Sequence, residues 1–411
     1  MKLKKSMNAI LGPLLWAGVM PAQADDSFLG NPSSSQRETV VHGHDKGLMT
    51  WPGITGTWAG VREDMDENGF TIEAVYTGEF AKNFTANPVT ANGLKKTVYQ
   101  SDTDLTLTVD TEKAGMWTGG TLFVYGLGNT GGNPTDYTGD LQGYSNIEAP
   151  NQWIVHEAWY QQEFDDGMFS ILAGLHDMNS EFYVSDYGSL FLNGSFGIGP
   201  ELSGNVPASL FPKAALGVRV SVKPTENSYV QAAMYDGDST TRTFKSAEGK
   251  LWVTEAGVSS DSGTYKLGCW QHTANKTFGA QTFSSDYGLY GVVDQEIVKL
   301  ENDGAIAGFL QYGYTPKSRN EIYTYIGAGL HIHGIVPNRA EDDLGLAVAR
   351  ADFHASAAAA KVSETAVELT YRLVVTPWFV VQPSFQWIKN PGGDSTAPAV
   401  KAGLLRFEVV L

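Results

Sequence analysis

The amino-acid sequence predicts an all-β protein: a transmembrane antiparallel β-barrel of about 16 strands, preceded by a short N-terminal helix. The first observation behind this is a period-two alternation of apolar and polar side chains from residue 70 to residue 411. Such alternation is typical of strands with one apolar face. The second observation is an N-terminus with the pattern of an export signal, while no later run of about 18 apolar residues could form a transmembrane helix.

Residues 1–24 are predicted to be a signal peptide. Lys2, Lys4 and Lys5 give a positive start, Ala9–Met20 is apolar, and Ala22–Ala24 offers small residues for cleavage. The apolar run is too short to cross a bilayer, which needs about 20 residues, although it could also be a buried helix of the mature fold. Cleavage after residue 24 removes three lysines and no acid, so the net charge changes from −17 to −20.

Residues 25–69 are predicted to be an N-terminal leader with a short helix. The leader is rich in Ser, Gly and Asn up to about residue 50, and Trp58–Asn68 follows as a candidate helix. Gly69 stands where a glycine commonly ends a helix. The barrel is expected to occupy residues 70–411.

The strands are predicted one by one from the alternation. In Phe70–Phe80, for example, the even positions are mostly apolar and the odd ones include Glu73 and Glu79. Five other segments alternate as clearly: Tyr99–Val109, Leu216–Lys223, Glu364–Leu373, Phe379–Trp387 and Leu405–Leu411. Weaker alternation is present at 119–128, 152–164, 168–176, 228–235, 251–258, 264–272, 287–297, 305–314, 320–333 and 344–353.

A soluble β-sandwich also alternates, so the direction of the apolar face has to be argued. Aromatic residues lie at the ends of the apolar faces, for example Phe70 and Phe80, as in the aromatic girdles of membrane barrels. The polar faces carry charges of both signs, as Arg406 and Glu408 do, which suits a wet lumen. We therefore expect the apolar face outside, in a barrel wide enough for an aqueous channel.

The polar faces then give the candidate pore-lining residues. Acidic and basic groups together create a transverse field in a pore. These candidates are Glu73, Glu79, Asp102, Asp104, Arg219, Lys223, Glu368, Arg372, Gln382, Gln386, Arg406 and Glu408.

Residues 177–212 lack clean alternation and are too long for a hairpin turn. We expect this segment to fold into the barrel as a constriction loop, although it could instead be an external loop that packs on neighbours in a trimer. It offers the polar groups and aromatic faces that a sugar would contact: Asp177, Asn179, Glu181, Asp186, Tyr187, Phe191 and Asn193.

The remaining motifs predict no catalytic, cofactor or metal site. His331 and His333 share one strand face, but without a nearby third ligand they are expected to be polar wall or loop residues. The acidic runs Asp236–Asp238 and Glu341–Asp343 lack the spacing of a calcium-binding EF-hand loop. The single cysteine, Cys269, excludes a disulfide framework, and the acidic charge argues against nucleic acid.

Several motifs, in order along the chain, resemble the OprB-type family of carbohydrate-selective outer-membrane porins. They begin with Gly56–Arg62 (GTWAGVR), in which Thr57 stands where the family usually has an acidic residue. They continue through Gly174–Phe182 (GLHDMNSEF), Gly334–Asp343 (GIVPNRAEDD) and Asn390–Gly393 (NPGG). The resemblance covers most of residues 51–411. It implies a sixteen-stranded sugar channel, usually with glucose-type monosaccharides favoured, and a homotrimer.

We therefore expect an outer-membrane porin, not an enzyme, through which small neutral sugars diffuse passively into the periplasm. The expected surroundings are outer-membrane lipid and lipopolysaccharide, with acidic loops solvated or bridged to headgroups by divalent ions. A general or cation-preferring porin is the alternative that the charge of −20 suggests. An outer-membrane barrel enzyme is a further alternative, weakened by the absence of a G-x-S-x-G or H-E-x-x-H motif.

Overall fold

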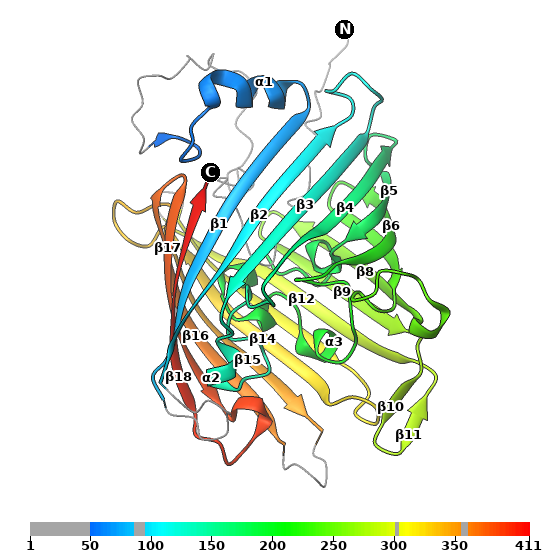
Figure 1. Cartoon of the computed structure of the whole chain (residues 1–411), viewed down its shortest axis with the longest axis vertical. Helices are drawn as coiled ribbons and strands as arrows, with labels where there is room; N and C mark the ends of the chain where they lie inside the picture. The colour runs from blue at the N-terminus through cyan, green and yellow to red at the C-terminus, as the bar shows by residue number, and fades with distance from the viewer. Residues whose placement is uncertain (1–49, 86–94, 301–303, 355–360) are drawn as a thin grey trace.

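The computed structural model describes residues 50–85, 95–300, 304–354 and 361–411. Sixteen strands in this part of the chain close into one antiparallel barrel (Figure 1). Each strand pairs with the strands before and after it, except that a separate hairpin, β10–β11, lies between β9 and β12. The predicted fold class is confirmed. The predicted signal peptide lies outside the described residues.

The barrel strands agree with the predicted segments to within a few residues. Their bounds are β1 Phe70–Asn83, β2 Thr97–Asp110, β3 Gly120–Gly131, β4 Gln152–Phe164, β5 Phe169–His176, β6 Ala215–Thr225, β7 Ser228–Asp236, β8 Lys250–Ser260, β9 Gly263–His272, β12 Asp286–Lys299, β13 Ala305–Tyr314, β14 Ile322–His333, β15 Asp343–Phe353, β16 Ser363–Thr376, β17 Phe379–Lys389 and β18 Val400–Val410. The hairpin strands are β10 Lys276–Phe278 and β11 Gln281–Phe283, and the α-helices are α1 Val61–Glu67, α2 Thr135–Thr138 and α3 Pro200–Ser203.

The barrel closes where the first strand meets the last. β1 pairs antiparallel with β18 from Val75 opposite Val410 to Asn83 opposite Ala402. Closure leaves no free edge in the barrel sheet, which a structure surrounded by lipid requires because lipid cannot hydrogen-bond to the backbone.

The side chains alternate between the two faces as the sequence predicts. On β1, Glu79 is fully buried inside the barrel, whereas the neighbouring Phe80 is 46% exposed on the outside. On β9, Leu267 is 70% exposed, and Cys269 lies on the same outer face. The apolar face is therefore the outer one, where it meets lipid.

The two ends of the barrel differ in the length of their connections. At the end where the chain enters β1 and leaves β18, adjacent strands are joined by short turns such as 226–227, 261–262 and 377–378. This end is at the top of Figure 1, and the longer connections, such as 132–151, lie toward the other end. Short turns are periplasmic and long loops extracellular in membrane barrels, so we assign the upper end to the periplasm.

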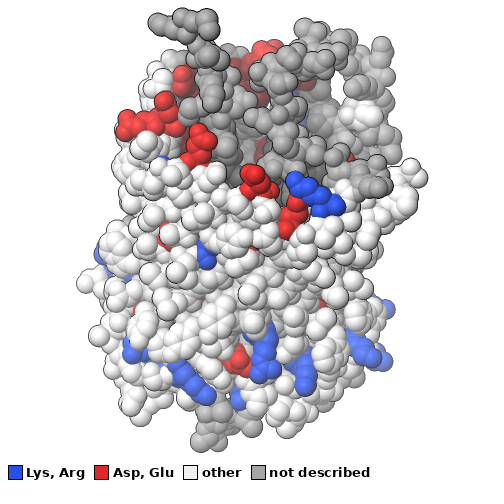
Figure 2. Space-filling model, turned by 180° about the vertical axis from the view of Figure 1, so that it is seen from behind, with Lys and Arg blue, Asp and Glu red and all other residues white. Residues whose placement is uncertain are grey.

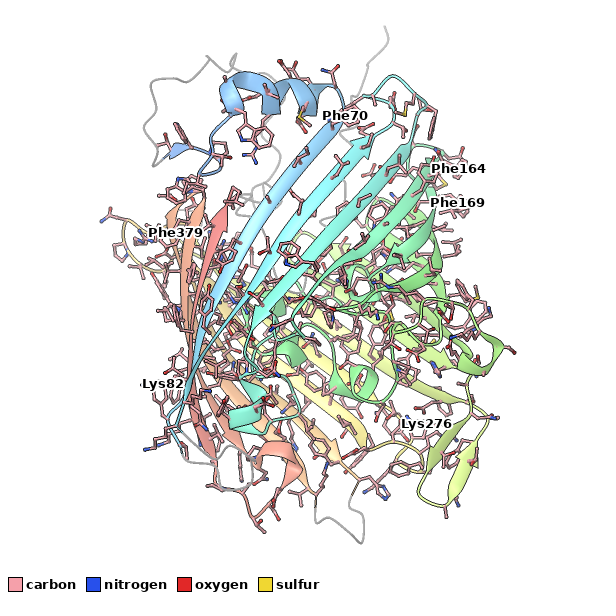
Figure 3. All side chains as sticks on the ribbon, in the orientation of Figure 1. Phe70, Lys82, Phe164, Phe169, Lys276 and Phe379 are labelled. Carbon is pink, nitrogen blue, oxygen red and sulfur yellow. The ribbon has the colours of Figure 1, made fainter. Side chains whose placement is uncertain are left out.

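Aromatic side chains mark the periplasmic end of the wall. Phe70, Phe164, Phe169 and Phe379 lie at this end in Figure 3, and the rings of Phe164 and Phe169 are 5.7 Å apart between centroids. Aromatic rings favour the boundary between hydrocarbon and water, which gives the barrel one of its girdles.

The predicted N-terminal helix forms at the periplasmic end, as a 3₁₀ turn at Trp58–Gly60 followed by α1. Gly69 follows the helix with φ of +83°, and a Cβ there would lie 2.6 Å from the carbonyl oxygen of Asp110. A side chain at position 69 would be strained at this φ and would clash with this oxygen, so the position requires glycine. Arg62 Nη2 donates a hydrogen bond of 2.5 Å to the carbonyl oxygen of Leu411, which ties α1 to the end of β18. Among the described residues, no helix is both long and apolar enough to span a membrane.

Candidate functional site

The connection between β5 and β6, residues 177–214, packs inside the barrel. Met178, Phe182 and Tyr183 are fully buried against inward-facing side chains of β6 to β9 and β12. The ring of Tyr183 stacks on that of Tyr290, with 4.2 Å between the centroids. Burial of these aromatic and aliphatic side chains fixes the first part of the segment to the inner wall.

The middle of the same segment has a second apolar anchor. The ring centroid of Phe191 lies 4.9 Å from that of Phe196 and 5.6 Å from that of Phe309 on β13. A Cβ on Gly345 would lie 2.7 Å from the Phe191 ring, so glycine on β15 makes room for it. Phe191, a predicted constriction residue, therefore holds the segment to the wall.

Carboxylates of the inner wall accept hydrogen bonds from the backbone of the segment. Glu368 accepts from the backbone nitrogens of Leu192 at 2.9 Å and Asn193 at 3.0 Å. In the same way, Asp294 accepts from the backbone nitrogen of Tyr187 at 3.1 Å. Buried N–H groups need partners, and a carboxylate is a strong one.

Two predicted glutamines also bind the inner segments. Gln382 donates to the carbonyl oxygen of Leu190 at 2.8 Å. Gln386 accepts from Asn193 Nδ2 at 3.0 Å and donates to the carbonyl oxygen of Tyr144 at 2.8 Å. Glu368, Gln382 and Gln386 thus face the lumen as the alternation predicts, but they are buried beneath packed chain.

A second connection, residues 132–151 between β3 and β4, also enters the lumen. Gln100 donates to Ser145 Oγ at 2.7 Å, and Glu364 accepts from the backbone nitrogen of Gln142 at 2.9 Å. Tyr144 is 1% exposed among side chains of β1 and β16 to β18. This segment is not among the predicted constriction residues, although its length and its lack of alternation are the same signal as for 177–212.

Two arginine–carboxylate pairs hold two of the four predicted basic residues of the lumen, Arg406 and Arg219. Arg406 Nη2 lies 2.9 Å from Glu79 Oε2 and donates to Asn146 Oδ1 at 2.5 Å. Arg219 donates to both carboxylate oxygens of Glu181, at 2.6 and 2.7 Å. Burial raises the pKa of Glu181, but the charges of Arg219 and His176 outweigh it and hold that pKa below its usual value.

Asp102 and Asp104 lie on neighbouring inward positions of β2. Asp102 accepts from Asn129 Nδ2 at 3.2 Å, and Asp104 accepts from the hydroxyl of Tyr125. Both carboxylates are at most 3% exposed. These predicted pore-lining residues therefore bind the neighbouring strand β3.

Four predicted pore-lining residues lie near the periplasmic ends of their strands, away from the two inner segments. Glu73, Arg372 and Glu408 are half-buried, and Lys223 is exposed. Arg372 Nη1 is 3.6 Å from Asp343 Oδ2. Lys223 still acts on Glu181 through its charge. Arg372 is linked to Tyr187 through Asp343 and His331. These two therefore reach the predicted constriction residues only indirectly.

A cavity of about 310 Å³ lies in the lumen between the two inner segments and the wall of β3 and β4. Its lining combines aromatic faces with hydrogen-bonding groups from three parts of the chain. Its lining includes Tyr125, Gln142, Asn146, His156, Glu157, Asp177, Asn179 and Phe211. The cavity thus presents both kinds of group that a sugar contacts.

A β-bulge explains why the alternation missed two of these residues. The pairing of β3 with β4 shifts between Tyr125 and Gly126, so two successive residues of β4, His156 and Glu157, are both buried inside. His156 Nε2 lies 3.2 Å from Asp177 Oδ2, and Glu157 accepts from the backbone nitrogen of Asp177 at 2.9 Å. Together they hold the first residue of the inner segment.

The remaining predicted residues of the segment shape it. Asn179 Nδ2 donates to the carbonyl oxygens of Phe182 and Gly197, at 3.0 and 3.1 Å, which joins two turns of the segment. The backbone nitrogen of Asp186 donates to Asp294 at 3.1 Å. Of the seven predicted constriction residues, Asp177 and Asn179 line the cavity.

His331 and His333 share one carboxylate partner. His331 Nε2 and His333 Nδ1 each lie 2.8 Å from Asp343 Oδ1 on β15. The ring of Tyr187 meets that of His331 edge to face at 5.7 Å, so this pair also contacts the inner segment. Within the described residues, no group of three or more His, Cys, Asp and Glu could hold a metal ion.

Comparison with known proteins relates this barrel to porins. Residues 95–411 match the model of the family described as carbohydrate-selective porin, OprB family. Porin B of Pseudomonas aeruginosa is 24% identical over 419 residues, an alignment that covers 85% of this chain and 90% of Porin B.

Solved structures share the fold. The high-pH structure of Pseudomonas putida OprB superposes with a TM-score of 0.80 at 21% identity, covering 89% of this chain and 100% of that one. The outer-membrane channel DcaP of Acinetobacter baumannii has a TM-score of 0.54 at 10% identity, covering 83% and 97%. Because the family model matches most of the chain and the fold is a closed porin barrel, this chain belongs to the OprB family of carbohydrate-selective porins of the outer membrane and is a channel, not an enzyme.

Proposed function

We propose that small neutral sugars, in particular glucose-type monosaccharides, diffuse through this barrel by way of the lumen cavity. The observation that supports this most directly is the cavity lining. The rings of Tyr125 and Phe211 and the amide groups of Gln142, Asn146 and Asn179 are part of this lining. Of these five side chains, Phe211 and Asn146 are half-buried and the other three are buried. A pyranose ring has C–H groups on its faces and hydroxyls around its rim, so it needs both kinds of contact. The volume of about 310 Å³ is in the range of small-molecule sites.

Two arginines that lie in the lumen are each balanced by a carboxylate. Arg406 and Arg219 each have a carboxylate partner at less than 3.0 Å, so neither cation is left unbalanced. Paired charges of opposite sign produce a local field that orients hydroxyl dipoles without attracting one sign of ion. The segment 177–214 serves as the constriction in this proposal.

Planar-bilayer recordings test the proposal. Glucose added to one side should reduce the ion current of wild-type channels in a concentration-dependent way, and the Tyr125→Ala variant should need more glucose for the same block. The Val124→Ala variant is the matched control, because its side chain is exposed on the outer face of the same strand. Wild-type current unaffected by glucose would refute the proposal. A reversal potential near that of an ideal cation channel would favour the cation-preferring alternative.

The assembly and export of the chain are also proposed. We infer a homotrimer, which rests on the family resemblance, and removal of residues 1–24 on export, which rests on the signal pattern. Native mass spectrometry of the detergent-extracted protein tests both in one spectrum. We expect the mass of three chains, each starting at Asp25. A monomeric mass would contradict the homotrimer, and a chain that retains Lys2–Ala24 would contradict cleavage after residue 24.

A further inference from the structure

The outer wall carries its charges unevenly. In Figure 2, Lys and Arg form a belt across the lower part of the wall, near the extracellular end, whereas Asp and Glu gather toward the periplasmic end. Lys82 and Lys276, labelled in Figure 3, both lie at the extracellular end. Because this end is assigned to the extracellular side, its lysines lie toward the headgroups of the outer leaflet.

Three lysines at the extracellular ends of their strands come from adjacent strands. Lys82 on β1 is opposite Gly403 on β18, and Lys401 is two residues from Gly403 on the same face. Lys401 in turn is opposite Trp387 on β17, two residues from Lys389. Diagonal neighbours of this kind have Cβ atoms about 7–8 Å apart, so two flexible lysine side chains can reach one anion. We call Lys82, Lys389 and Lys401 the lysine patch.

The lysine patch is exposed and lacks internal counter-charges. All three side chains are exposed, and none of them forms an ion pair with a described carboxylate. Arg350, on the extracellular half of β15, differs because Asp352 Oδ1 lies 2.7 Å from its Nη2. Three uncompensated cations close together attract a polyanionic partner.

The surface next to the lysine patch is apolar. On the membrane side of it, Phe385 and Leu405 are 43% and 45% exposed, and Leu369 on β16 is 49% exposed. Phe385 is opposite Leu369 and Gly403 in the sheet, so this apolar area is continuous across β16, β17 and β18. A ligand that matches both parts has an anionic headgroup and acyl chains.

We propose that the lysine patch binds the phosphate groups of a phosphorylated glycolipid of the outer leaflet, directly and without a bridging metal ion. The acyl chains of this lipid lie on the apolar area beside Phe385. The inference rests on the outer-membrane orientation of the barrel but not on its sugar selectivity. It differs from the expectation that acidic loops reach lipid headgroups through divalent ions.

The test measures lipid binding to the detergent-solubilised full chain by native mass spectrometry, with diphosphoryl lipid A as the probe. Each lysine near a lipid phosphate contributes about fivefold in affinity, so the K82Q/K389Q/K401Q variant should bind roughly 100-fold more weakly. The K82R/K389R/K401R variant keeps the charge and should bind like the wild type. K113Q, on a periplasmic turn, is the control for loss of a surface lysine.

Three further measurements distinguish direct binding of the lipid phosphates from binding through a metal ion and from binding of free phosphate. Monophosphoryl lipid A should bind more weakly than the diphosphoryl form, and binding should survive EDTA. Inorganic phosphate should not compete at concentrations comparable to the lipid. Unchanged binding by the glutamine variant, loss of binding in EDTA, or equal competition by phosphate would each overturn the proposal. Glucose should block the current of the glutamine variant as strongly as that of the wild type. A failure of the sugar proposal is therefore detected independently of lipid binding.

Discussion

Replacing Glu368 by alanine tests whether the wall carboxylates keep the segment 177–214 inside the barrel. The Glu368 side chain accepts hydrogen bonds from the backbone nitrogens of Leu192 and Asn193 and from Ser384 Oγ, at 2.8–3.0 Å. Alanine at position 368 leaves these two N–H groups and this hydroxyl buried without their acceptor.

The size of the effect follows from the two backbone donors. A buried donor without a partner costs about 1–3 kcal/mol, so the two N–H groups cost at least about 2 kcal/mol. That value increases the population of a detached segment roughly 30-fold. Glu368→Gln keeps the shape of the side chain, but its NH₂ group cannot accept from a backbone N–H, so an intermediate effect is expected.

Single-channel recording detects the detached state, because a segment that leaves the lumen widens the path for ions. We expect Glu368→Ala to show high-conductance openings roughly 30 times more often than the wild type. Glu73→Ala is the control, since Glu73 is half-buried near the periplasmic end and away from the segment. Heat-modified gel mobility verifies that each barrel is folded. Conductance identical to the wild type in a folded Glu368→Ala channel would refute the reasoning.

The other predictions concern charge, pH and stacking. Arg219→Met removes the cation that balances Glu181, so the reversal potential should shift toward cation preference. A shift toward anion preference would contradict this. Burial raises the pKa of Glu201 to about 7. The free energy that attaches its segment to the wall is therefore largest below about pH 4.5, falls as the pH rises to about 7, and is constant above that. The total decrease in this free energy is about 3 kcal/mol. Proteolysis of the segment should therefore be faster at pH 8 than at pH 5 in the wild type, and this difference should be smaller in Glu201→Gln, where only the other carboxylates of the lumen still titrate; the same profile in both proteins would disprove the role of Glu201. Phe211→Ala should weaken glucose block by about threefold to tenfold, because one aromatic face contributes about 1 kcal/mol, and unchanged block would show that the sugar does not contact Phe211.

The alternation predicted the strands and their faces because both depend on neighbouring residues. A side chain two positions away in a strand points the same way, so the inward direction of Glu79 and the outward direction of Phe80 can be derived locally. The bulge at His156 and Glu157 breaks this rule by one residue, and nothing in the local pattern indicates it.

The contents of the lumen could be predicted only in part. The length of 177–212 indicated an inner segment, but the partners of that segment are far away in the sequence. Glu368 contacts Leu192 across 176 residues, and such a contact has no periodic signal. The alternation therefore predicted a water-lined wall at Glu368 and Gln386, whereas these side chains support packed chain.

The pairing of β1 with β18 has a consequence for how the barrel is made. Residues more than 300 positions apart, such as Val75 and Val410, form the seam. Every other strand can pair with a neighbour that was synthesised just before it, but the seam must wait for the last eleven-residue strand. Until β18 arrives, β1 and β17 expose unpaired backbone that lipid cannot satisfy. A chain that ends before β18 should therefore be retained by the assembly machinery or degraded, rather than inserted as a fifteen-stranded pore.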